Sequence, residues 1–284
     1  MLFSVVIPTC HRNDHLAECL NRLDSGQQTL GRDDYSVIVT DDGSTSTAEA
    51  MIAGKFSWAR WLQGPRRGPA ANRNCGAAEA TAPWIVFCDD DCLPTPGFLE
   101  AYARAVREHP ETRVFEGRTS ADRPRRHPLE VAPINAQGGH LWSCNFCISR
   151  DLFRKLGGFN EQFPYAAMED MDFYKRVKQV EGPALFVPEA EIIHPWRMLD
   201  VKSQARKHVA SQSIYAQLHP EDWRLFTFSQ HLKNAARYYL REFPSEVREF
   251  GWLAIRAQPL RWWDLAYRGW RAAKLPKPGP RSPS

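Results

Sequence analysis

The sequence predicts an α/β protein with a mostly parallel central sheet, flanking helices and a helical C-terminal extension. Short apolar runs alternate with helical patterns of about 10–15 residues over the first 110 residues, which is the order expected of βαβ units. Acidic or polar residues directly follow several of these runs. From about Asp200 onward, apolar residues recur at helical spacing.

The N-terminal half contains four predicted strands, each apolar, β-branched or aromatic and each followed by a helical pattern. Asn13 or Asp14 can cap the first of these helices, and Pro69 suits the first turn of the third. The strands are expected at 2–7, 35–40, 58–62 and 84–88.

After His109-Pro110 the pattern changes, and the polar, Pro-rich stretch 121–139 predicts a mobile loop. Further strands are expected at 113–119, 142–149, 185–187 and 191–194, with helices at 150–156 and from Glu169 to about Val180.

The amino-acid composition limits which class of protein this chain can belong to. Hydrophobic residues make up 43% and charged residues 25% of the 284, as in ordinary globular proteins. No apolar run approaches the roughly 20 residues of a membrane span, and Met1-Leu2-Phe3-Ser4 lacks a basic leader, so a cytoplasmic protein is expected. The seven cysteines indicate reduced thiols. Cys144 and Cys147 would point to opposite faces of a strand, which argues against a zinc site with Cys88 and Cys92.

Three aspartates, Asp89, Asp90 and Asp91, follow the apolar run 84–88. Ligands of open α/β sheets bind at the carboxyl ends of strands, and adjacent carboxylates repel one another unless a cation lies among them. On an extended backbone Asp89 and Asp91 would point the same way and could bridge a divalent cation and its diphosphate, while Asp90 points elsewhere. The alternative is a solvated acidic loop.

Other polar motifs fall at predicted loop ends, and together they resemble those of family 2 glycosyltransferases, which have the GT-A fold, a Rossmann-like sheet with flanking helices. The resemblance covers roughly residues 1–195, and each motif is weak by itself. The matching pieces are Val5-Val6-Ile7-Pro8-Thr9, Asp41-Asp42-Gly43-Ser44, Gly68-Pro69-Ala70-Ala71-Asn72-Arg73-Asn74, Phe87-Cys88-Asp89-Asp90-Asp91, Gly157-Gly158-Phe159 with Glu161, and Glu169-Asp170-Met171-Asp172 followed by Ile193-His194.

The resemblance implies a nucleotide-sugar site. Pro8, Thr9 and Asp41 would hold the base and ribose of a nucleoside-diphosphate sugar. Arg73 would lie near the diphosphate, and Asp90 near the ribose or sugar.

It also implies a metal ion and a general base. Asp91, with Asp89, would hold Mg²⁺ or Mn²⁺, and His194 fits the late metal ligand of the family. Asp170 fits the base that deprotonates the acceptor, although it could simply cap a helix, and Glu169 or Asp172 could be the base instead. By position alone, Trp142, Asn145 and Glu169 are assigned to the acceptor side.

The expected organisation is a nucleotide-sugar-binding half at 1–110, an acceptor-binding half at 111–199, a helical extension at 200–275 and a disordered tail at 276–284. The expected activity is metal-dependent, inverting transfer of a sugar to a hydroxyl of a glycan or lipid-linked acceptor. The expected donor is a UDP-linked sugar. A nucleotidyltransferase would need a Gly-rich loop after the first strand, where Pro8-Thr9-Cys10-His11 stands instead. A non-catalytic nucleotide-sugar-binding protein is the other alternative.

Basic residues are concentrated in the C-terminal part: from Arg197 onward there are 16 Lys+Arg and 7 Asp+Glu, against 21 and 26 before it. On the last predicted helix, Leu260, Trp263, Tyr267 and Trp270 share one face and basic residues the other. Such a composition is typical of helices in a membrane interface, so peripheral membrane contact through 245–274 is one expectation. Packing on the catalytic domain or on another subunit, for example in a homodimer, is the alternative. Nucleic-acid binding is not expected, because the usual motifs are missing from the sequence.

Overall fold

A computed structural model describes residues 1–274, so the disordered tail predicted at 276–284 lies outside the described residues. The chain forms two compact units. Unit 1 comprises Met1–Arg123 and Ala132–Pro195, and unit 2 comprises Pro124–Val131 and the residues from Trp196 onward.

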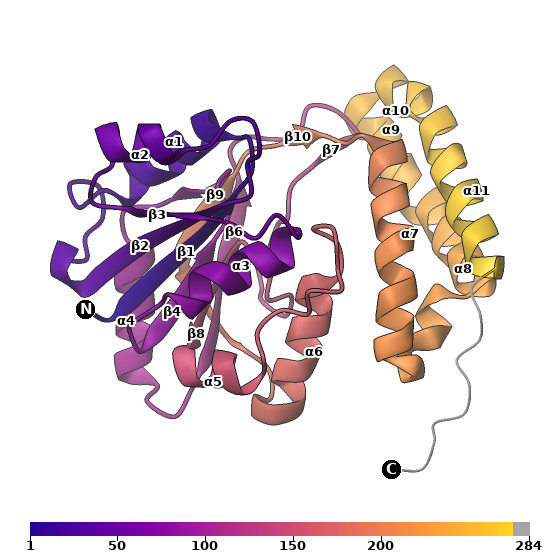
Figure 1. The fold of residues 1–284 in the computed structure, drawn as a ribbon. Helices are drawn as coiled ribbons and strands as arrows, with labels where there is room; N and C mark the ends of the chain where they lie inside the picture. Colours follow the sequence, from indigo (N-terminus) through magenta and orange to yellow (C-terminus); the bar gives the residue numbers. More distant parts are fainter. Residues whose placement is uncertain (275–284) are drawn as a thin grey trace, which may run out of the picture. The chain divides into compact units, whose positions relative to one another are not determined.

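Unit 1 is built on an eight-stranded sheet in the order β3-β2-β1-β4-β8-β6-β9-β5 (Figure 1). The first four strands in this order are parallel, whereas β8 runs antiparallel to both β4 and β6. The predicted parallel sheet of the N-terminal half is thus confirmed, with a mixed part added to it. The strands are β1 (Phe3–Thr9), β2 (Tyr35–Asp41), β3 (Arg60–Gln63), β4 (Trp84–Cys88), β5 (Leu93–Pro94), β6 (Val114–Ala121), β8 (Asn145–Ser149) and β9 (Leu185–His194).

Both faces of this sheet are buried, which is why its strands read as continuous apolar runs. Along β1, Val5 and Ile7 belong to the core on one face, and Val6 belongs to the core on the other. The first core includes side chains of α1 (Asn13–Leu23), α2 (Glu49–Lys55) and α4 (Phe98–Glu108); the second includes α3 (Pro69–Ala78), α5 (Arg150–Lys155) and α6 (Glu169–Glu181).

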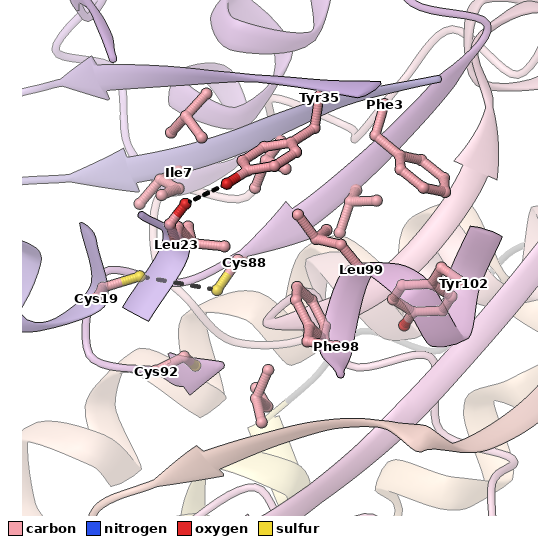
Figure 2. Packing of buried hydrophobic residues seen from close by; sticks show 14 of the residues in the cluster. Phe3, Ile7, Cys19, Leu23, Tyr35, Cys88, Cys92, Phe98, Leu99 and Tyr102 are labelled. Atoms are coloured by element: carbon pink, nitrogen blue, oxygen red, sulfur yellow. Dashed lines mark hydrogen bonds between the residues drawn. The ribbon is translucent and has the colours of Figure 1, made fainter. Parts of the chain in front are cut away.

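Two polar contacts cross the first core, as Figure 2 shows. The Tyr35 hydroxyl donates to the carbonyl oxygen of Leu23 at 2.7 Å, which ties β2 to the end of α1. Cys19 Sγ lies 3.9 Å from Cys88 Sγ, which places α1 against the end of β4. Helix α1 is therefore fixed to the sheet edge at which the acidic motifs begin.

Several boundaries differ from the predicted ones because long-range pairing decides them. The two short strands expected near 185 and 191 form one strand, β9, whose register against β6 shifts between Gly117 and Thr119. The stretch 121–139 is not uniformly loose, since Asn135 exchanges two backbone hydrogen bonds with Thr119 at 3.0 Å each. Strand β8 begins at Asn145 instead of Trp142.

Unit 2 is mainly helical, as expected from about Asp200. A short antiparallel pair, β7 (Glu130–Val131) with β10 (Arg197–Met198), precedes the helices. Helix α11 packs against α7 and α8, and none of the helices within residues 1–274 is long and apolar enough to cross a membrane. The helical elements are α7 (Val201–Leu218), η2 (Pro220–Phe226), α8 (Phe228–Arg237), the π-helical turn η3 (Tyr238–Glu242), α9 (Phe243–Phe250), α10 (Trp252–Arg256) and α11 (Gln258–Lys274).

Candidate active site

The candidate site lies at the carboxyl ends of β1, β2 and β4 in unit 1. Thr9 and Asp41 are paired at the ends of β1 and β2, and Pro8 is buried in β1 opposite Thr40. Asn72 of α3 joins these ends, because its Nδ2 donates to the carbonyl oxygens of Thr9 at 3.2 Å and Thr40 at 2.9 Å. The first turns of α3 are thereby fixed beside the strand ends.

Asp41 is almost completely buried, and its carboxylate is held by the protein itself. Oδ1 accepts from the Gly43 amide at 2.8 Å and Oδ2 from the Ala48 amide at 2.6 Å, with Trp61 Nε1 at 3.3 Å from Oδ2. Asp41 therefore shapes the loop after β2.

Asp90 is fully buried and is held from β1 and from the start of α1. Thr9 Oγ1 donates to Asp90 Oδ2 at 2.7 Å, and Arg12 Nη2 lies 2.9 Å from Oδ1. Arg12 also donates from Nη1 to Asp91 Oδ2 at 2.7 Å. Burial raises the pKa of Asp90 to about 7, although the Arg12 charge opposes this rise. Arg12 was not among the residues predicted from the sequence, because only the fold brings it to Asp90 and Asp91.

Arg73 is the buried cation of the site. Its Nη2 lies 2.7 Å from Asp89 Oδ1, and its Nη1 lies 3.1 Å from Glu169 Oε1. Burial alone would lower the pKa of Arg73, but the charges of Asp89 and Glu169 outweigh burial and raise it. This one guanidinium joins β4, α3 and α6.

Asp170 lies next to Glu169 in the first turn of α6, which follows Met168 in a left-handed conformation at φ 73°. A non-glycine residue in this region is strained, and such strain is concentrated at functional sites. Burial raises the pKa values of both carboxyl groups, that of Asp170 to about 6, against the opposing charge of Arg73. Asp172, the alternative base, instead accepts from Arg176 at 2.7 Å and 3.0 Å.

Asp91 and His194 form a candidate metal site. His194 Nδ1 lies 2.9 Å from the carbonyl oxygen of Pro195, and since a carbonyl only accepts, Nδ1 carries the proton. Nε2 then faces Asp91 Oδ1 at 3.3 Å. Metal-binding histidines are oriented in this way by a carbonyl behind the ring. Burial would lower the pKa of His194, but the hydrogen bond to Asp91 and the charge of that residue raise it. In the neutral ring with the proton on Nδ1, Nε2 and Asp91 Oδ1 are the atoms that could hold a divalent cation.

Cys92 is a third donor beside this pair, which the sequence analysis did not select. Its Sγ and the ligand atoms of Asp91 and His194 all lie within 4.8 Å of one another. The thiol is fully buried, and burial raises its pKa well above the ordinary value.

The side chains of Asp89 and Asp91 point in different directions. The prediction that they point the same way, as on an extended backbone, is therefore wrong. Strand β4 ends at Cys88, and the Cys92 amide donates to the Asp89 carbonyl at 3.2 Å across a turn. Asp89 contacts Arg73, while Asp91 contacts Arg12 and His194. The turn thus distributes three adjacent carboxylates among different partners.

On the expected acceptor side, the structure gives Asn145 a structural position. Asn145 is 1% exposed, donates to the carbonyls of Arg118 at 2.8 Å and Ala190 at 3.0 Å, and accepts from the Tyr102 hydroxyl at 2.7 Å. Trp142 is half-buried and stacks on His140, with ring centroids 5.1 Å apart.

Buried Glu116 positions the loop that carries this pair. Its Oε2 accepts from the amides of His140 at 3.1 Å and Leu141 at 2.9 Å, and its Oε1 accepts from Gly139. This role could not be predicted from the sequence, because no local pattern marks a carboxylate that binds a loop more than 20 positions away.

The mostly parallel sheet with helices on both faces, with Asp41 buried at the end of β2 and Asp90 buried after β4, makes unit 1 a GT-A-type domain. Solved structures agree on the fold. TarS from S. aureus in complex with UDP-GlcNAc superposes with a TM-score of 0.58 at 17% identity, over 97% of this chain and 90% of that one. GalNAc-T7 with UDP, GalNAc and Mn²⁺ superposes with a TM-score of 0.57 at 15% identity, over 70% of this chain and 44% of that one.

The chain belongs to the family described as "Glycosyl transferase family 2", whose model matches residues 4–162. Among relatives, validoxylamine A glucosyltransferase of Streptomyces hygroscopicus subsp. limoneus is 32% identical over 217 residues, covering 62% of this chain and 48% of that protein. Pre-mycofactocin glycosyltransferase of Mycobacterium tuberculosis is 28% identical over 233 residues, covering 75% and 45%. The chain thus spans about half the length of these relatives.

Proposed function

We propose that this protein is a metal-dependent, inverting glycosyltransferase that moves a sugar from a UDP-linked donor to a hydroxyl of a glycan or lipid-linked acceptor. The observation that carries this proposal is the convergence of Asp89, Asp90 and Asp91 with Arg73, Glu169 and His194 at one edge of the sheet. Family membership over residues 4–162 supports the reaction class.

The donor nucleotide is assigned to the ends of β1, β2 and β4. Pro8, Thr9 and Asp41 would border the base and ribose, with Asp90 near the ribose or sugar and Arg73 near the diphosphate. The choice of UDP is supported by structural neighbours whose complexes contain UDP or UDP-GlcNAc. Buried Arg73 is suited to an anion because its guanidinium is always charged.

Asp91 and His194 would hold Mg²⁺ or Mn²⁺, with Asp89 next to them. When bound, such an ion stabilises negative charge on the departing diphosphate. Their donor set of one carboxylate oxygen and one imidazole nitrogen suits either ion, with a preference for Mn²⁺.

Asp170 is the proposed general base. The acceptor oxygen forms a bond to the anomeric carbon, its proton passes to Asp170, and the bond between that carbon and the diphosphate breaks. One displacement inverts the configuration and requires no second nucleophile. Glu169, paired with Arg73, holds the start of α6 and places Asp170 at the site.

The acceptor class rests on the relatives and on the aromatic pair on the acceptor side. Poly(ribitol-phosphate) beta-glucosyltransferase of Bacillus spizizenii is 33% identical over 108 residues, which are 36% of this chain and 17% of that protein. The stacked rings of His140 and Trp142 offer an aromatic surface of the kind that can contact a sugar. We therefore place the protein in cell-surface polysaccharide or glycolipid synthesis.

The test is a thermal-shift panel of nucleoside-diphosphate sugars with Mn²⁺, followed by a transfer assay with the donor that stabilises the protein most. A ligand that binds only the native state raises its melting temperature. UDP-sugars should give the largest shift, and Asp91→Ala should abolish the Mn²⁺-dependent part of it. Asp33→Ala, which removes an exposed aspartate just before the start of β2, at the end of the strand opposite Asp41, should leave the shift unchanged. No shift with any donor would refute the proposal.

A further inference from the structure

The C-terminal unit exposes a group of large apolar side chains around α10. These are Trp252, Leu253, Ile255, Leu260 and Trp262, which we call the apolar tip. Trp252 is 67% exposed and Trp262 is 58% exposed. Scattered exposed apolar residues are normal on a soluble protein, whereas five within eleven positions indicate a binding surface.

The backbone of this stretch is well anchored, so the exposure is built into the fold. Gly251 reverses the chain after α9 with φ 54° and ψ −125°. Ala254 and Ala257 are buried beneath the tip, and buried Gln258 donates to the Ala254 carbonyl at 2.9 Å and accepts from the Tyr239 hydroxyl at 3.0 Å. Small and amide side chains thus face inward and tryptophans face outward, the reverse of a helix that packs on its own core.

The stripe expected on the last helix is only partly exposed, since Leu260 and Trp270 are 37% and 51% exposed. Trp263 and Tyr267 are half-buried and stacked, with ring centroids 5.0 Å apart, and Lys202 Nζ of α7 lies 5.7 Å from the Trp263 ring. Those two aromatic residues pack inside unit 2. The exposed apolar residues that lie closest together along the chain are those of α10 and the residues on either side of it.

The charges around the tip favour an anionic partner. Arg248 and Arg256 are exposed beside it, together with one exposed acid, Glu249. Glu246 is buried and neutralised by Arg261, whose Nη2 lies 2.8 Å from its Oε1. The chain from Arg197 onward carries 16 Lys+Arg and 7 Asp+Glu. Two copies meeting through this surface would bring like charges together, which disfavours a second copy as the occupant.

We propose that the apolar tip docks the protein on an anionic lipid bilayer, with Trp252 and Trp262 in the interfacial layer and Arg248 and Arg256 at the lipid headgroups. Tryptophan suits this depth because its ring is apolar and its N–H remains hydrogen-bonded. Basic residues add attraction to anionic headgroups that salt screens. The inference stands on unit 2 alone and does not depend on the proposed sugar transfer.

The experiment is co-sedimentation of the full chain with vesicles of phosphatidylcholine alone or with about one quarter phosphatidylglycerol. The wild-type protein should bind the anionic vesicles, and binding should fall as salt rises. Trp252→Ser/Trp262→Ser should weaken binding at least about tenfold, and Arg248→Gln/Arg256→Gln should weaken it on anionic vesicles. Leu240→Ser is the matched control, because it removes a 78% exposed apolar side chain of unit 2 outside the tip.

Circular dichroism and thermal melting of each variant separate loss of docking from loss of folding. If the tryptophan variant folds and still binds as tightly as the wild type, the tip is not the membrane contact. The lipid proposal is overturned if the wild type binds neither kind of vesicle. It is also overturned if light scattering shows a wild-type dimer that is lost in Trp252→Ser/Trp262→Ser.

Discussion

Arg73 Nη1 lies 3.1 Å from Glu169 Oε1, although the two residues are 96 positions apart. Both side chains are 3% exposed, and the same guanidinium also reaches Asp89. The ion pair therefore connects the first turns of α3 and α6 and fixes Asp170 beside the acidic motif of β4.

Replacing Arg73 by methionine should lower the free energy of unfolding by about 3–5 kcal/mol, because it leaves buried Glu169 without its cation. Adding Glu169→Gln to Arg73→Met should recover part of this loss, since the uncompensated charge is then removed. Denaturant unfolding measures both. The control is Arg60→Met, which breaks an exposed pair with Glu79 and should cost about 0–1 kcal/mol. Equal losses at Arg73 and Arg60 would contradict the structural role of Arg73.

If Asp170 is the base, it must be ionised to accept a proton. Burial raises its pKa to about 6, so kcat/KM should fall as the pH decreases below about 6. With an ordinary aspartate the fall would begin near pH 4. Asp170→Asn should lower kcat by about 10²–10⁴ and remove this limb of the pH profile while donor affinity stays nearly unchanged. Asp172→Asn should show the same fall of kcat/KM at low pH as the wild type. If Asp170→Asn also shows this fall, another residue is the base.

The spectrum of bound Co²⁺ would show which of Asp91, Cys92 and His194 are ligands of the proposed metal ion. In the metal-free protein burial raises the pKa of the Cys92 thiol, which favours its protonated form, so we expect Asp91 and His194 to bind the ion without Cys92. Bound Co²⁺ should then show ligand-field bands without a thiolate charge-transfer band in the near ultraviolet. Asp91→Asn or His194→Ala should weaken Co²⁺ binding by about 10–100-fold or more, whereas Cys92→Ser should change it little. A charge-transfer band that Cys92→Ser removes would make Cys92 a ligand.

Arg12 would compete with a bound cation for Asp91, because its Nη1 is 2.7 Å from Asp91 Oδ2. Arg12→Ala should therefore tighten Mn²⁺ binding, by no more than about fivefold for an ion pair whose arginine is 42% exposed. Titration calorimetry at fixed pH measures the change. Arg22→Ala, at the exposed end of α1, is the control and should leave the affinity unchanged. Weaker binding without Arg12 would mean that this arginine supports the site.

The acidic motifs illustrate what local patterns can specify. The strand before Asp89 was predicted because its residues form a continuous apolar run, and Thr9, Asp41 and the Asp89–Asp91 group lie at one sheet edge because the parallel strands before them end together. The direction of each carboxylate was not predicted, since the turn after Cys88 ends the alternation. Arg12 and Glu116 could not be selected either, because each acts on residues that are distant in sequence.

The sequence by itself determined the alternating strands and helices, the order of the motifs and the basic, aromatic character of the C-terminal part, because these depend on neighbouring residues and on hydrophobic periodicity. Only the tertiary structure decided which charges pair, where Asn145 is fixed, and that Trp252 and Trp262 are exposed while Trp263 and Tyr267 pack inside unit 2. The physical reason is that burial and ion pairing depend on contacts between distant segments, and these form only when the chain is folded.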